Sequence, residues 1–116
     1  MNFAVFELPK AKSDKHFIFE WLYEHSRPGA AAWLNAYDAC IKRLELHADS
    51  FRAALENDGL KLDGLKLDGL KLDVKQAFFK TRRGRVYRML FHIEENNVYV
   101  LRVRGPGQAP IEPSDI

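Results

Sequence analysis

The chain has 116 residues, 47% of them hydrophobic and 12% aromatic, which suits one compact domain over residues 1–116 with a single apolar core. This composition excludes a disordered chain, and no apolar run has the length of a membrane span, so no membrane partner is expected. Its one cysteine, Cys40, cannot form an intramolecular disulfide, so we expect a cytoplasmic protein.

The net charge of +2 is unevenly distributed along the chain. Residues 1–59 carry seven Lys and Arg against nine Asp and Glu, whereas residues 60–116 carry eleven against seven. A basic half of a small domain is typical of nucleic-acid binding or of an acidic protein partner. Ordinary solubilising charge would give the same composition, so the totals leave both interpretations open.

The first half predicts one strand and two helices. Residues 3–8 are rich in Phe and Val and end at Pro9, as a short strand would. Ser13 is a candidate N-cap for a helix over 14–25. A second helix is expected over 29–47, with Pro28 in its first turn. Helical spacing places two apolar stripes in the core: Phe17, Ile18, Trp21 and Leu22, then Trp33, Leu34, Tyr37, Cys40, Ile41 and Leu44.

Residues 59–73 repeat one pentapeptide three times, "GLKLDGLKLDGLKLD". A five-residue period would turn the leucines of a continuous strand to opposite faces at each copy, and three copies are too few for a solenoid. We therefore interpret the repeat as a duplicated connector, whose extra length costs little closure entropy. A functional extension is the alternative.

Three strands are predicted after the repeat, over 74–80, 86–93 and 98–104. The segment "TRRGR" joins the first two, and "EENN" forms a tight turn between the last two. The tail 105–116 has three prolines and two glycines and is expected to be irregular. The order is thus β-α-α-β-β-β, an α+β fold with two antiparallel helices on one face of a small antiparallel sheet.

Strand alternation assigns the basic side chains to a surface. Along 86–93, Tyr87, Met89, Phe91 and Ile93 share one face, and Arg88, Leu90 and His92 share the other. Along 98–104, the apolar set Tyr99, Leu101 and Val103 is expected to face the helices. The open face then receives Arg88, Arg102 and Arg104, and the rim near the loop receives Lys80, Arg82, Arg83 and Arg85. Arginine binds phosphate and carboxylate groups with two hydrogen bonds, so these residues are candidates for an anion-binding surface.

The remaining reactive side chains form no recognised constellation. His16, His25 and His47 are scattered along the helices without metal-ligand spacing, so neither a metal nor another cofactor is expected. Cys40 lies in the apolar stripe of the second helix and is expected to be buried rather than nucleophilic. His92 shares a face with Arg88, and histidine in general titrates near neutrality, but a partly exposed strand histidine without a catalytic role is the preferred interpretation.

Two stretches resemble the RelE/ParE superfamily of toxins from type II toxin–antitoxin modules. These are "IFEWLYEHS…GAAAWLNAYDACIKRLELHADSF" and "VKQAFFKTRRGRVYRMLFHIEENNVYVLRVRG", and the Tyr-Arg strand, hairpin and closing strand within the second are the most specific part. The resemblance implies the β-α-α-β-β-β fold and a small growth-inhibiting toxin that a cognate antitoxin neutralises by direct binding. The helical half is more similar to ParE-like, plasmid-stabilisation sequences.

The resemblance leaves two activities open. ParE-like members bind DNA gyrase and trap its cleaved complex, whereas RelE-like members cut mRNA on the ribosome without a metal. For cleavage, Arg88 matches a phosphate-stabilising arginine of the family. Lys80 with Arg82 or Arg83 would activate the 2′-hydroxyl, and His92 would replace a missing proton donor. The tail 105–116 lacks the Tyr, His, Lys or Arg that RelE-like members carry there, which favours ParE-like gyrase binding. An acidic antitoxin segment is expected beside Arg88, Arg102 and Arg104, and a non-toxic RNA- or protein-binding domain is the alternative outside the family.

Overall fold

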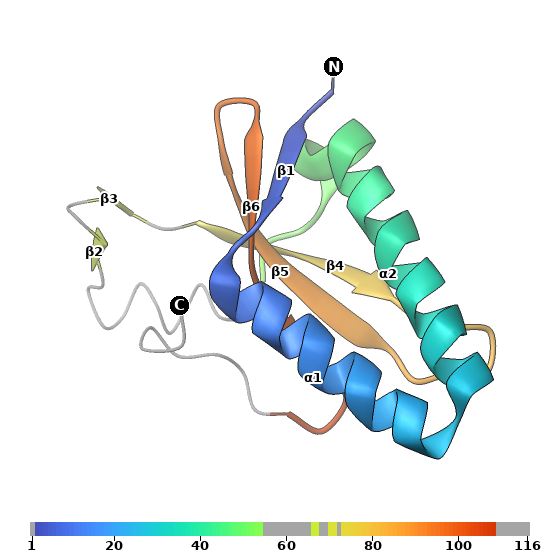
Figure 1. The fold of residues 1–116 in the computed structure, drawn as a ribbon. Coiled ribbons are helices and arrows are strands. Elements are labelled where there is room, and N and C mark those ends of the chain that lie inside the picture. The colour runs from blue at the N-terminus through green and yellow to red at the C-terminus, as the bar shows by residue number, and fades with distance from the viewer. Residues whose placement is uncertain (1, 55–65, 68–69, 72, 109–116) are drawn as a thin grey trace.

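Two helices lie against one face of a four-stranded sheet (Figure 1). The computed structural model describes residues 2–54, 66–67, 70–71 and 73–108. Four strands form the sheet in the order β1-β6-β5-β4, with bounds β1 Ala4–Glu7, β4 Val74–Phe79, β5 Tyr87–Glu94 and β6 Asn97–Arg104. The expected α+β class is confirmed.

The sheet is mixed rather than antiparallel. Strands β4, β5 and β6 form an antiparallel meander, but β1 pairs parallel with β6, with Ala4 opposite Asn97 and Glu7 opposite Val100. The expectation of a wholly antiparallel sheet is therefore wrong. The prediction failed because the apolar pattern of residues 3–8 indicates a strand but does not indicate which strand it pairs with. The observed partner of β1 is β6, which lies far along the chain.

Helix α1 spans Pro9–His25 and helix α2 spans Arg27–His47, so Ser26 alone separates them. Helix α1 begins earlier than expected because Pro9, which has no N–H to leave unsatisfied, occupies the first turn. The predicted cap at Ser13 is wrong. Ser26 caps α2 instead, where its side-chain oxygen accepts a hydrogen bond from the Gly29 N–H at 3.1 Å.

The segment between α2 and β4 begins with a short 3-10 helix, Ala48–Ser50, after which Ala54 N donates to Val74 O at 2.8 Å. Within the repeat, β2 (Lys66–Leu67) pairs antiparallel with β3 (Leu70–Lys71). The rest of the repeat and the tail from residue 109 lie outside the described residues, so the connector hypothesis stays a prediction.

A β-bulge in β6 changes which side chains face the helices. Leu90 pairs with Arg102 and Phe91 with Val100, which leaves Leu101 as the extra residue between them. Val98 and Val100 therefore lie on the helix side, and Tyr99 and Leu101 lie on the other. The expectation that Tyr99 and Leu101 face the helices is wrong, because a one-residue shift exchanges the faces.

The main core fills the space between the helices and the sheet. It contains Trp33, Tyr37, Cys40 and Leu44 from α2, and strand residues from β4, β5 and β6, with Ala11 and Ile18 from α1. A smaller apolar cluster covers the middle of the opposite sheet face, where Ala54, Val74, Leu90 and Leu101 are buried. That face is thus partly apolar. None of the described helices is both long and apolar enough to cross a membrane.

Candidate anion-binding surface and aromatic pocket

Two arginines lie side by side at one end of the sheet, on the face away from the helices. Arg88 of β5 is directly opposite Arg104 of β6, and Phe78 of β4 is opposite Arg88 on the other side. Arg88 Nη1 donates to Gln76 Oε1 at 3.1 Å, which orients the guanidinium across the strands. Phe78 is 51% exposed, so an aromatic ring lies next to Arg88 on the side away from Arg104. Like charges directly opposite each other destabilise a sheet, and an anion bound between them offsets that repulsion.

Arg102, the third predicted member of this surface, forms an ion pair with Asp14 of α1. Its Nε and Nη2 atoms donate to the Asp14 carboxylate of α1 at 2.7 and 2.8 Å, and both side chains are only 15% exposed. Asp14 Oδ2 also accepts from the Val103 N–H at 2.9 Å. The carboxylate that binds Arg102 comes from a helix 88 residues earlier in the chain.

His92 lies at the opposite end of the same face from Arg88 and Arg104. Its Nδ1 is 2.9 Å from the Asp73 carbonyl oxygen, which only accepts, so Nδ1 is the donor of this hydrogen bond. His92 lies four positions after Arg88 on β5, about 13 Å along a strand. Lys80, just after the end of β4, is exposed at the Arg88 end. The three candidate catalytic residues, Arg88, Lys80 and His92, therefore do not lie around one common phosphate position.

The loop between β4 and β5 carries the other predicted cations. Arg82, Arg83 and Arg85 are all exposed on it. Arg83 and Arg85 belong to the wall of a pocket on the helix side of the molecule, whereas Arg82 does not line it. The basic cluster of the sequence is thus divided between two surfaces, with Arg88 and Arg104 on one and Arg85 on the other.

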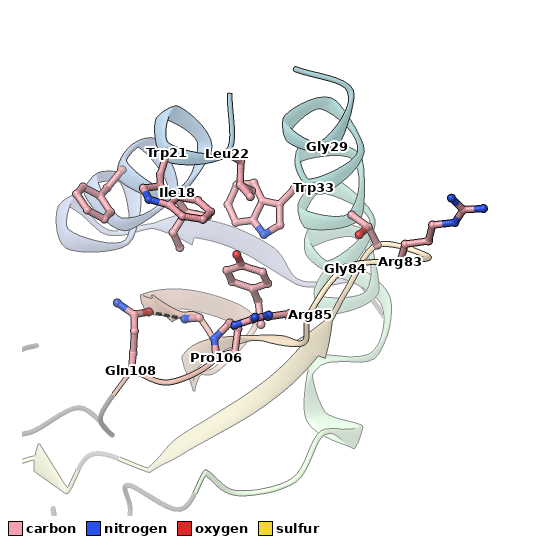
Figure 2. Close-up of a pocket in the computed structure, with 14 residues that line it drawn as sticks. Ile18, Trp21, Leu22, Gly29, Trp33, Arg83, Gly84, Arg85, Pro106 and Gln108 are labelled. Carbon is pink, nitrogen blue, oxygen red and sulfur yellow. Dashed lines mark hydrogen bonds between the residues drawn. The ribbon is translucent and has the colours of Figure 1, made fainter. Parts of the chain in front are cut away.

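The pocket has a volume of about 750 Å³ and lies between α1, the start of α2, the 81–85 loop and the segment after β6 (Figure 2). Most of its lining is apolar or aromatic. Its lining residues are Phe17, Ile18, Trp21, Leu22, Gly29, Trp33, Thr81, Arg83, Gly84, Arg85, Tyr87, Gly105, Pro106 and Gln108.

Trp33 is the most buried of the lining residues. Its ring packs against Tyr37, Phe79 and Tyr87, with centroids 5.5, 5.8 and 5.6 Å away. Only 2% of Trp33 is exposed, and its Nε1–H has no hydrogen-bond partner within the part of the chain that the structure describes. Burial raises the pKa of Tyr87, opposed by the positive charge of Arg85, so its hydroxyl remains protonated at neutral pH.

Phe17 and Trp21 form the outer wall and are 69% and 52% exposed. The sequence placed both in the core, which is wrong. Six of the seven residues 17–23 are apolar or aromatic, so this part of α1 is apolar around most of its circumference, and only one side of it can face the sheet. That surplus was the signal in the sequence for an exposed apolar surface.

Two glycines allow the chain to pass close to the pocket. A Cβ on Gly84 would lie 2.1 Å from Thr81 Oγ1, within the turn that the Gly84 N–H closes on the Thr81 carbonyl oxygen. A Cβ on Gly105 would lie 3.0 Å from the Tyr87 ring. Gln108 folds back so that its side-chain oxygen accepts from the Gly105 N–H (Figure 2).

The other reactive groups form no further site among the described residues. No three His, Cys, Asp or Glu side chains gather there as metal ligands. Cys40 is buried beside Met89, and burial raises the pKa of its thiol, which opposes a nucleophilic role.

Comparison of the sequence with models of protein families finds no match, and comparison with curated proteins finds none either.

Proposed function

We propose that this chain is the toxin of a type II toxin–antitoxin module, and that it acts by binding its target, as ParE-like toxins bind DNA gyrase. The sequence resemblance motivates the proposal, and the α+β arrangement of a helical hairpin on a sheet is compatible with it. The observation that carries it is the cross-strand pair of Arg88 and Arg104 beside the exposed ring of Phe78. Two adjacent guanidinium groups suit a polyanion or an acidic protein surface.

Binding is favoured over cleavage because the groups for acid–base chemistry lie apart. Metal-free RNA cleavage requires a base, a stabiliser of the phosphorane charge and an acid around one phosphate. His92, the imidazole on this sheet face, lies about 13 Å from Arg88 by strand geometry and donates to the Asp73 carbonyl.

The RelE-like alternative, ribosome-dependent mRNA cleavage, rests on Lys80. Lys80 follows Phe79, and Phe78 is the cross-strand partner of Arg88, so the ammonium and guanidinium groups lie at the same end of the sheet. A lysine and an arginine are two of the groups that such a reaction uses, and a proton donor from the ribosome or the RNA itself would complete it.

The test is induced expression in a bacterium, followed by two assays with purified chain. One measures gyrase-dependent DNA cleavage and supercoiling, and the other measures ribosome-dependent cuts in a defined mRNA. We expect growth arrest, inhibited gyrase and intact mRNA, with loss of all effects in Arg88→Ala. Lys42→Ala, which removes an exposed cation from α2, is the control. Undisturbed growth, gyrase and translation would refute the toxin proposal, whereas cuts in mRNA would establish the alternative.

Antitoxin recognition is proposed at the same surface, now limited to Arg88 and Arg104 because Asp14 holds Arg102. We expect Arg88→Glu with Arg104→Glu to abolish capture of the acidic antitoxin encoded beside the gene. Unchanged antitoxin affinity in that double variant would exclude this surface as the neutralisation site.

A further inference from the structure

The pocket beside α1 has three properties that the proposed function does not use. One is a buried hydrogen-bond donor, the second is an exposed apolar wall, and the third is a cation on the rim. Each of them selects a chemical feature of the ligand, and together they define one class of partner.

The donor is the Trp33 indole N–H. An indole nitrogen only donates, and a buried donor without a partner is destabilising. Figure 2 shows this nitrogen on the side of the Trp33 ring that faces the 84–85 loop across the pocket. The ligand atom that satisfies it must be an acceptor, such as a carbonyl oxygen.

The apolar wall is provided by Phe17 and Trp21, one helical turn apart on α1, with Ile18 and Leu22 beside them. Exposed apolar patches of this kind mark protein–protein contacts. One face of the Trp21 ring is covered by His25, whose ring stacks on it at 4.0 Å. A nucleobase would leave several polar edge atoms without partners against this lining, whereas a large aliphatic or aromatic side chain would not.

The rim cation is Arg85. Figure 2 shows its side chain running back along the pocket, while Arg83 extends from the loop into solvent. Neither arginine forms an ion pair with a carboxylate in the described part of the chain. A guanidinium in this position fits a carboxylate with two hydrogen bonds.

We propose that this pocket binds an acidic peptide segment of a partner protein. The segment inserts one large apolar side chain against Phe17 and Trp21, offers a backbone carbonyl to the Trp33 N–H, and places a carboxylate on Arg85. This inference does not require the chain to be a toxin, and the pocket lies on the other side of the sheet from Arg88 and Arg104.

The test uses the Trp33 N–H itself as the reporter. The chain has two tryptophans, so a ¹⁵N-labelled sample gives two indole N–H signals, and Trp21→Ala leaves that of Trp33. The probe is unlabelled acetyl-Glu-Asp-Leu-Leu-Glu-Asp-amide, for which we expect a dissociation constant of about 1 mM. The Trp33 signal should move downfield and saturate, and the shift should weaken as salt is raised.

Two control peptides test the chemistry of the ligand. Replacing both leucines by alanine, or all four acids by lysine, should remove the shift of the Trp33 signal. Adenosine monophosphate tests the nucleotide alternative. An unmoved Trp33 signal with the acidic leucine peptide, equal shifts with the alanine peptide, or saturable binding of the nucleotide alone would each overturn the proposal.

Matched variants test the site. Arg85→Ala should weaken the acidic peptide several-fold, whereas Arg82→Ala, on the same loop but outside the pocket, should leave its affinity unchanged. Trp21→Ala should also weaken binding, and Phe78→Ala, which removes an equally exposed ring from the other side of the sheet, should not. Equal effects within either pair would show that the peptide binds elsewhere.

Discussion

The Asp14 carboxylate joins α1 to the last strand by accepting from both the Arg102 guanidinium and the Val103 backbone N–H. β1 pairs with β6 only as far as Val100, so none of the described strands lies beside this edge of β6 beyond that point. Asp14 supplies the acceptor that a strand would have supplied at Val103. The interaction thus protects a sheet edge and orients α1 at once.

Removal of Asp14 should be costly for stability. Asp14→Ala leaves a largely buried guanidinium and a strand N–H without their acceptor, so we expect a loss of about 3 kcal/mol in the free energy of unfolding. Urea denaturation measures it. The control is Glu20→Ala, which breaks the exposed pair with His16 and should cost less than about 0.5 kcal/mol. Equal losses in the two variants would contradict the role given to Asp14.

Alkaline pH should destabilise the fold through Tyr37. Burial, followed by its hydrogen bond to Glu7 at 2.5 Å, raises the pKa of Tyr37 above the usual value. The stability that the protonated Tyr37 contributes is fully present below the unfolded pKa of about 10. It is lost progressively above that pH, because the unfolded chain then releases a proton that the folded chain keeps. We expect unfolding free energy to fall above pH 10, and to fall less steeply in Tyr37→Phe.

Urea denaturation at about pH 9 and about pH 11 measures that slope. Tyr23→Phe removes a hydroxyl from an exposed ring and controls for the substitution itself. The same slope in Tyr37→Phe and in the wild type would exclude Tyr37 as the origin of the alkaline effect.

Cys40 should report global unfolding. Its side chain is fully buried, its Sγ lies 3.9 Å from Met89 Sδ, and burial raises the pKa of the thiol. A thiol reagent should therefore react only when the core opens, at the rate that unfolding kinetics give independently. Rapid labelling of the native protein would show that the core opens locally near Cys40.

The turn before β5 should depend on Gly84. Gly84→Ala places a methyl group against Thr81 Oγ1, so we expect a loss of about 1–2 kcal/mol in unfolding free energy and weaker peptide binding at the pocket. Because the contact is mainly with the Thr81 hydroxyl, Thr81→Ala should restore part of the stability in the double variant. If the double variant is no more stable than Gly84→Ala, the destabilisation arises from the backbone and not from the contact with the Thr81 hydroxyl.

The strands and helices could be predicted from local sequence patterns, because alternation and helical spacing are properties of short segments. The predicted strand over 86–93 and the observed β5, Tyr87–Glu94, differ by one residue at each end. Three features could not be predicted in this way: the parallel partner of β1, the bulge at Leu101 and the start of α1 at Pro9. The first two are set by long-range pairing, and the third by a proline that served equally well as a strand terminator.

The candidate site shows the same division. Strand parity put Arg88, Arg102 and Arg104 on one face, and the register agrees, because Arg88 is opposite Arg104 and Leu90 is opposite Arg102. Parity contains no information about a helix that crosses the sheet edge, so the binding of Arg102 by Asp14 was missed. The pocket was missed because Trp21 was counted among core residues.

The pairing of the first strand with the last also determines when the fold can be completed during synthesis. Residues 97–100 must leave the ribosome before β1 has a partner, and residues 102–103 before Asp14 has its own. Until then the nascent chain holds a helical hairpin whose apolar side has no complete sheet beneath it. Neither the Arg88–Arg104 surface nor the closed wall of the pocket exists in that interval, so both surfaces form only after β6 has left the ribosome.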